Sequence, residues 1–217
     1  QAIKVENYSA LGDYYQFFSD RESGKGLWVP FYEMVIKYAK NNPDFEKNVA
    51  YAHLGIGIYR VQQSRYEEAS QIFNTALLIF TKLKDTTGIS CTHAFCYPLY
   101  ASIHLYEKAI DEQNQALKFI TAAEKKKGLD EFYANENYQD KALIYLSWYE
   151  MSGNKKHLDS ADQYINRTPL TGGYGKRWKP FHYFLSGYRY FLNKDFKQAL
   201  TDIELSLSHD EFYSEIN

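Results

Sequence analysis

The stretch YRVQQSRYEEASQIFNTAL, residues 59–77, decides the fold. Its second part opens an apolar stripe that runs to residue 83, and the spacing of the stripe puts its members on one side of an α-helix. The members are Tyr66, Ala69, Ile72, Phe73, Ala76, Leu77, Phe80 and Leu83. An apolar segment, residues 49–62, and a short polar turn, residues 63–65, precede the stripe. The stretch therefore predicts a helix, a tight turn and a second helix.

The same pattern returns twice further along the chain. One copy holds Tyr106, Ala109, Ile110, Gln113, Ala116, Leu117 and Ile120, and the other holds Phe196, Ala199, Leu200, Ile203 and Leu207. Each copy follows an apolar segment, residues 88–103 or 180–192, and a turn at residues 104–105 or 193–195. Two weaker copies pair Leu11, Gly12 and Tyr15 with residues 30–41, and residues 137–152 with 155–167. The sequence thus predicts five helix pairs.

Composition excludes several other classes of protein. The chain has 217 residues, of which 45% are hydrophobic and 24% charged, so it resembles a globular protein and not a disordered one. Its net charge of −2 offers no basic surface for nucleic acid or an anionic membrane. No apolar run approaches the ~20 residues needed to span a bilayer, so we expect no membrane insertion of this segment. The aromatic content of 18% suits a helix-rich core packed with rings.

These helix pairs resemble the tetratricopeptide repeat, whose unit has a small residue on its first helix and Tyr, Ala, aromatic and Ala positions on its second. The second pair matches with Gly57, Tyr66, Ala69, Phe73 and Ala76, and the last pair with Gly187, Phe196 and Ala199, while Ser206 replaces the final Ala. The third pair has Tyr97 where the small residue belongs, followed by Pro98. We therefore expect its first helix to be kinked or to start late.

The resemblance implies an all-α fold, a right-handed α-solenoid of about five antiparallel helix pairs. We expect one domain over residues 1–217, with units near 6–43, 46–84, 87–127, 136–168 and 178–210. The second-helix alanines are 40, 52 and 38 residues apart, longer than the 34-residue period of the family, so we expect insertions at residues 20–27, 126–137 and 168–178. Residues 209–217 keep an apolar pattern and predict the start of another helix, as in a chain that continues.

The resemblance also implies a concave groove lined by the first helix of each pair. In the register above, the residues directed toward it are Asp13, Gln16, Phe17, Tyr51, Leu54, Ile58, Gln62, Asp140, Ser147, Glu150, Phe181, Phe184, Tyr188 and Phe191. This groove is aromatic and mildly acidic. It lacks the Lys and Asn pattern of the subfamily that clamps the C-terminal carboxylates of chaperones, so a chaperone-tail adaptor is not expected.

Two clusters invite a chemical interpretation. Cys91, His93, Cys96 and His104 lie within fourteen residues, but no paired-ligand spacing completes a zinc site, and we interpret them as packing residues. The two cysteines, five positions apart on a helix, lie too far apart for a disulfide. Residues 171–178 combine glycines with Lys176 and Arg177 and form a candidate anion loop. No phosphate-loop ending completes it, so we favour a connecting loop.

We predict a non-enzymatic scaffold that binds a protein or peptide in its groove, without a cofactor or metal. The alternative is the ligand-sensing region of a larger bacterial signal-transduction or transcription-regulatory protein, since the long repeats resemble those of such proteins. An enzyme with a site at the 171–178 loop is the third interpretation, although no catalytic motif accompanies it. Nothing in the sequence decides between a cytoplasmic and an extracytoplasmic location.

Overall fold

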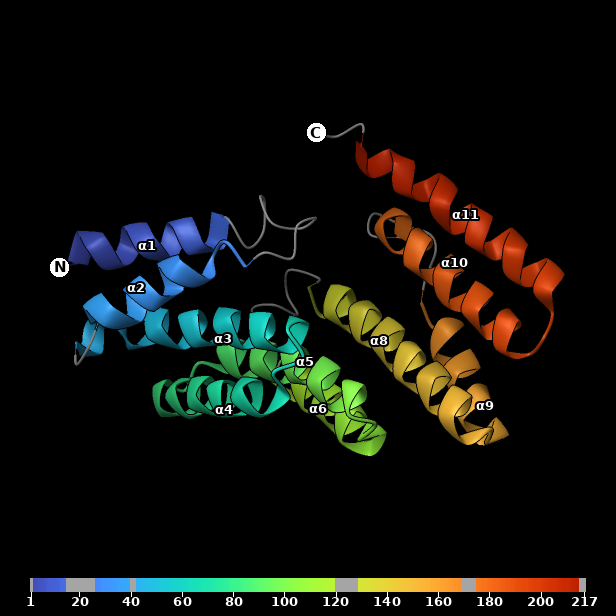
Figure 1. Cartoon of the computed structure of the whole chain (residues 1–217), viewed down its shortest axis with the longest axis horizontal. Helices are drawn as coiled ribbons and strands as arrows, with labels where there is room; N and C mark the ends of the chain where they lie inside the picture. Colours follow the sequence, from blue (N-terminus) through green and yellow to red (C-terminus); the bar gives the residue numbers. More distant parts are fainter. Residues whose placement is uncertain (1, 15–25, 40–41, 120–128, 169–174, 215–217) are drawn as a thin grey trace. The chain divides into compact units, whose positions relative to one another are not determined.

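The computed structural model describes residues 2–14, 26–39, 42–119, 129–168 and 175–214 (Figure 1). Every regular element among these residues is helical, so the predicted all-α class is confirmed. The α-helices are α1 (Ala2–Tyr14), α2 (Val29–Ala39), α3 (Glu46–Gln62), α4 (Tyr66–Leu83), α5 (Thr86–Ser102), α6 (Tyr106–Lys118), α8 (Leu129–Ser152), α9 (Lys155–Ile165), α10 (Gly175–Leu192) and α11 (Phe196–Ser214). A short 3₁₀-helix, Pro43–Phe45, leads into α3.

The chain forms two compact units. The first comprises residues 1–103 and 114–121, and the second comprises residues 104–113 and 122–217. Helices α1 to α5 belong to the first unit and α8 to α11 to the second, while α6 contributes residues to both.

Two apolar cores hold the first unit together. One joins α1, α2 and α3 and contains Val5, Trp28, Val29, Tyr32, Val35, Ala39, Phe45, Ala52 and Ile56. The other joins α3, α4 and α5 and contains Ala50, Leu54, Ala69, Phe73, Ala76, Phe80, Ile89, Cys96 and Leu99. Phe73 and Phe80 are 2% and 0% exposed, and burial of each such ring stabilises the fold by about 1.5–3 kcal/mol. The apolar stripe of residues 66–83 therefore faces inward, as its spacing predicts.

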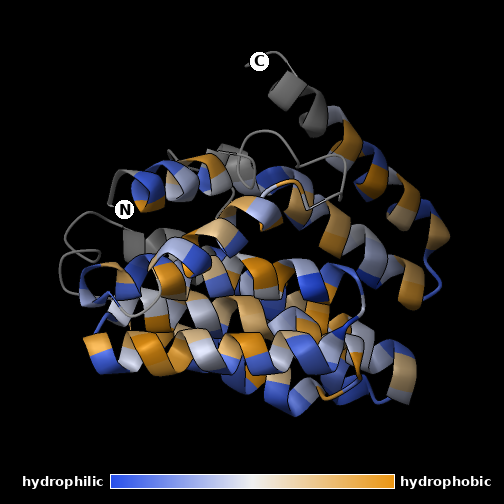
Figure 2. Ribbon diagram, turned by 60° about the vertical axis from the view of Figure 1, so that its left-hand side comes forward, coloured by the Kyte–Doolittle hydropathy of each residue, from blue (hydrophilic) through white to orange (hydrophobic). Residues whose placement is uncertain are grey.

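The second unit has its own core where α8, α9 and α10 meet. It contains Ala142, Leu146, Leu158, Ala161, Ile165 and Leu185. Helix α11 packs against α10, and the two helices approach closely at Gly187, where a Cβ atom would lie 2.9 Å from Ile203 Cδ1. Figure 2 shows hydrophobic and hydrophilic residues interspersed along each of these helices. Among the described helices, none is long and apolar enough to cross a membrane.

One turn geometry recurs through the chain. Ser64, His104, Gly153 and Lys194 all have left-handed backbone conformations, with φ between 58° and 64°, and each lies two positions before the first residue of the following helix. In the turn after α3, the Arg65 N–H donates to the Arg60 carbonyl at 2.9 Å. The equivalent bond after α10, from Asp195 to Tyr190, is 3.0 Å long. Both turns are Schellman motifs, so the repeat seen in the sequence is also present in the backbone.

The predicted late start of the third pair is wrong. Helix α5 begins at Thr86, because the Asp85 side chain caps it by accepting a hydrogen bond from the Gly88 N–H at 3.0 Å. The helix then continues through Pro98 to Ser102. The helix boundaries of the second pair agree with the prediction, since α4 spans the predicted residues 66–83.

Two segments are more helical than the sequence predicts. Helix α8 begins at Leu129, inside the predicted insertion 126–137, and α10 begins at Gly175, inside the predicted insertion 168–178. The first turn of α10 is held by Trp178, whose side chain is buried and whose carbonyl accepts a hydrogen bond from Gln139 Nε2 at 3.1 Å. Residues 209–214 extend α11 and do not start another helix.

Candidate functional site

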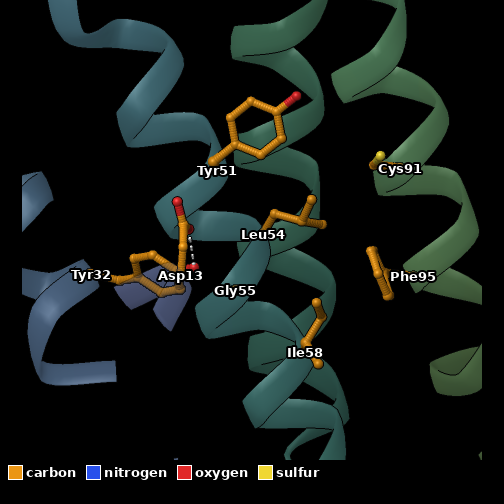
Figure 3. A pocket seen from close by; sticks show the side chains of 8 residues that line it. All are labelled: Asp13, Tyr32, Tyr51, Leu54, Gly55, Ile58, Cys91 and Phe95. Carbon is orange, nitrogen blue, oxygen red and sulfur yellow. Dashed lines mark hydrogen bonds between the residues drawn. The ribbon is translucent and has the colours of Figure 1, made fainter. Parts of the chain in front are cut away.

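A hollow of about 110 Å³ lies among the helices of the first unit (Figure 3). It is lined by Asp13, Tyr32, Tyr51, Leu54, Gly55, Ile58, Cys91 and Phe95. These residues come from α1, α2, α3 and α5, so the first helices of three successive segments, α1, α3 and α5, meet at one place. Four of the predicted groove residues, Asp13, Tyr51, Leu54 and Ile58, belong to this lining.

Helix α3 supplies the floor of the hollow. Tyr51, Leu54 and Ile58 are three and four positions apart, which puts them on one side of the helix. Leu54 is only 4% exposed and is part of the core shared by α3, α4 and α5. The Tyr51 ring meets the buried Phe80 ring edge-on, with centroids 4.8 Å apart. The floor is therefore anchored in the core and keeps its shape without a ligand.

The polar side of the hollow comes from α1 and α2. Tyr32 Oη donates a hydrogen bond to Asp13 Oδ1 at 2.8 Å, the contact drawn as a dashed line in Figure 3. Tyr32 is 2% exposed, and α1 approaches it so closely that a Cβ on Gly12 would lie 2.3 Å from Tyr32 Cε1. Burial, together with the Asp13 carboxylate, raises the pKa of Tyr32 well above its usual value. The tyrosine therefore stays a neutral donor that fixes one oxygen of the exposed carboxylate.

The opposite wall comes from α5. Figure 3 shows Cys91 and Phe95 on this helix, facing Leu54 and Ile58 across the hollow. Phe95 is 40% exposed, so much of its ring is open to a ligand. The sequence analysis assigned no groove residue to the third pair. The turn residue of the third pair, His104, lies 40 positions after Ser64 in the second pair. The same shift of 40 positions leads from Tyr51 to Cys91, so the repeat register could have predicted Cys91 as a lining residue.

The residues considered for zinc do not converge. Cys91 lines the hollow, whereas Cys96 is 8% exposed in the core, and neither forms a disulfide. The His93 ring stacks on Phe119 with centroids 6.0 Å apart, and His104 Nδ1 lies 2.9 Å from Tyr106 Oη. Among the described residues, no three His, Cys, Asp or Glu side chains are grouped as metal ligands.

The remaining predicted groove residues of α3 and α8 have separate surroundings. Gln62 is exposed at the C-terminal end of α3. In the second unit, Asp140 Oδ2 accepts a hydrogen bond from Gln113 Nε2 at 2.8 Å, while Ser147 is partly buried on the same helix. Gln16 and Phe17 lie outside the described residues.

Helix α10 carries a row of aromatic rings at the predicted positions. Phe184 stacks with Phe181 and Tyr188, with centroids 5.8 Å and 6.3 Å away. Tyr188 Oη donates to Glu150 Oε2 at 2.6 Å, and burial with this hydrogen bond raises the pKa of the tyrosine. Phe191 meets Phe196 of α11 edge-on, with centroids 5.8 Å apart. Of the three stacked rings on α10, Phe181 and Tyr188 thus pack partly against the core of the second unit, and Phe184 is exposed.

Part of the predicted anion loop is helical, because α10 begins at Gly175. Lys176 and Arg177 lie in the first turn of α10, and their side chains are outside the described part of the structure. A polar hollow of about 140 Å³ elsewhere in the second unit is lined by Asp162, Ile165, Asn166, Ser186, Arg189 and Tyr190. The Arg189 guanidinium in this hollow is already paired, because it donates two hydrogen bonds, of 2.7 Å and 2.8 Å, to the Asp162 carboxylate.

Comparison with known proteins finds no matching family model and no matching curated protein.

Proposed function

We propose that the protein is a non-enzymatic recognition module that binds an extended peptide of a partner protein across the first helices of its pairs. The observation that carries this proposal is the hollow of the first unit. It is formed jointly by α1, α3 and α5, and its floor is the set of α3 residues that the repeat register directs toward a groove. A right-handed solenoid of tetratricopeptide-like pairs is part of the proposal, supported by the recurring Schellman turns.

The size of the hollow favours a peptide over a small-molecule ligand. Its volume is about 110 Å³, whereas pockets for drug-sized ligands measure about 300–1,000 Å³. A space of this size suits one side chain of a longer ligand, whose neighbouring residues would contact the adjoining surfaces of α1, α3 and α5. The second unit has its own aromatic residues at the equivalent positions of α10, since Phe181, Phe184 and Tyr188 lie 130 positions after Tyr51, Leu54 and Ile58. Of these three rings, Phe184 is exposed, and exposed aromatic rings are common anchors in protein recognition.

The test is selection of peptides from a random displayed library on the purified protein, followed by fluorescence anisotropy with the selected peptides. Phe95→Ala removes a wall of the hollow, so we expect affinity to fall about tenfold. Leu78→Ala is the matched control, because Leu78 lies on α4, is 72% exposed and does not line the hollow. Selected peptides that bind wild type and Phe95→Ala equally well would contradict the proposal, as would a library that yields no binder.

A further inference from the structure

The lining of the hollow combines an apolar surface with a single carboxylate. Leu54, Ile58 and Phe95 present hydrocarbon to the space, and Asp13 alone among the described lining residues carries a formal charge. Lys47 Nζ lies 5.8 Å from the Tyr51 ring centroid but pairs with Asp85 Oδ2 at 2.7 Å. None of the ion pairs given for the described residues includes Asp13. Within the described part of the chain, the charge of Asp13 is therefore not neutralised by an ion pair.

The carboxylate is held in place and keeps capacity for a ligand. The hydrogen bond from Tyr32 uses one acceptor site on Asp13 Oδ1. An ionised carboxylate offers about four acceptor sites over its two oxygens, so a further donor can bind. Because Tyr32 is buried and its ring is fixed by the close approach of Gly12, the carboxylate is oriented before a ligand arrives.

We propose that this hollow receives a lysine or arginine side chain of the bound peptide, an inference that rests on the peptide-binding function proposed above. The methylene stem lies on Leu54, Ile58 and Phe95, and the cationic head donates to Asp13. Long basic side chains bury their stems on apolar surface while the charged head stays near water. An acidic side chain is repelled by Asp13, and a purely apolar one would place hydrocarbon against the carboxylate without supplying a cation for its charge.

The experiment compares peptides and protein variants in pairs. A selected peptide is synthesised with lysine and with norleucine, which keeps the stem and lacks the ammonium group. Asp13→Asn removes the charge and keeps an acceptor for Tyr32. We expect wild type to bind the lysine peptide about fivefold to tenfold more tightly than the norleucine peptide, and Asp13→Asn to bind the two alike. The preference in wild type should shrink in high salt, because the carboxylate is exposed.

Cys91 supplies an independent readout at the wall of the hollow. A bound side chain should slow alkylation of Cys91 by iodoacetamide, followed by mass spectrometry with fragmentation that separates it from Cys96. Protection of Cys91 by the lysine peptide in wild type, with much less in Asp13→Asn, is the expected result. Equal binding of lysine and norleucine peptides would overturn the basic-side-chain assignment.

The outcomes separate this inference from the proposed function. If no displayed peptide binds, the peptide-binding function itself is wrong. If peptides bind in a manner sensitive to Phe95→Ala but show no lysine or arginine at any selected position, the function stands and the assignment of a basic occupant is overturned. If a basic residue is selected but Cys91 stays fully reactive, the basic side chain binds outside the hollow and the assignment is again overturned.

Discussion

The α3–α4 pair and the α10–α11 pair share a sequence pattern and a turn, related by a shift of 130 residues. Gly57 packs against Phe73 in the first pair, and Gly187 packs against Ile203 at the equivalent positions of the second. The left-handed turn residues, Ser64 and Lys194, are related by the same shift and lie in the same hydrogen-bonded turn. The shared sequence pattern therefore sets the internal geometry of a pair.

The two pairs differ in what covers the second helix. Helix α5 packs on α4, and a Cβ on Gly88 of α5 would lie 2.2 Å from the Phe80 ring, which is 0% exposed. On α11 the outer stripe stays open, since Phe196 and Leu207 are each 62% exposed, whereas Tyr66 and Leu77 at the equivalent positions of α4 are partly buried. An apolar stripe thus stabilises its pair fully only where a neighbouring helix covers it.

The largest expected effect tests this difference directly. Phe73→Ala removes a ring that is 2% exposed, so it should lower the free energy of unfolding by about 3–5 kcal/mol. Ile203→Ala removes a smaller, partly buried side chain, so it should cost about 1–2 kcal/mol. Urea unfolding followed by circular dichroism gives the two losses, and amide hydrogen exchange in α4 and α11 assigns each loss to its pair. Equal losses in the two variants would mean that coverage of α4 by α5 adds little to the stability of the α3–α4 pair.

An intermediate effect concerns the glycine of the first helix in each pair, Gly57 or Gly187. A Cβ at Gly57 would lie 2.6 Å from Phe73 Cε1, in a ring enclosed by the core, so Gly57→Ala should destabilise the protein by about 1–3 kcal/mol. At Gly187 the nearest atoms, 2.9 Å away, belong to the Ile203 side chain, which can rotate, and the Ala199 carbonyl oxygen lies 3.1 Å away. The better helix propensity of alanine offsets the remaining clash, so Gly187→Ala should change stability by less than about 1 kcal/mol. Thermal unfolding of both variants measures the contrast, and a larger loss at Gly187 would contradict it.

The sequence predicted what depends on local spacing. The stripe from Tyr66 to Leu83 and the polar turns gave the all-α class and the bounds of α4, because amphipathic period and turn residues are local properties. The same register placed Tyr51, Leu54 and Ile58 on one side of α3, where they form the floor of the hollow.

What the sequence did not predict depends on tertiary contact. Pro98 suggested a helix that is kinked or starts late, but with the Asp85 cap and the packing around Gly88 α5 begins at Thr86. The first turn of α10 was predicted as loop from its glycines, whereas in the structure it is helical and includes the buried Trp178, whose carbonyl bonds to Gln139 of α8. The Tyr32–Asp13 hydrogen bond joins residues 19 positions apart on different helices, and no spacing rule relates them.

The smallest expected effects test whether the turns, which share one backbone geometry, also respond alike in stability to substitution. Lys194 has φ of 64°, a strained conformation for a residue with a side chain, so Lys194→Gly should stabilise the protein by about 0.5 kcal/mol once the entropy cost of glycine is subtracted. Ser64→Gly should gain less, because it also loses the 3.3 Å hydrogen bond from Tyr66 Oη.

Gly153 has the same φ as Lys194, and a Cβ there would touch nothing within 4 Å. Gly153→Ala should therefore lose about 1 kcal/mol through backbone strain alone. Thermal unfolding resolves these three values, and a loss of stability in Lys194→Gly would show that its side chain, and not the shared turn, stabilises the last pair.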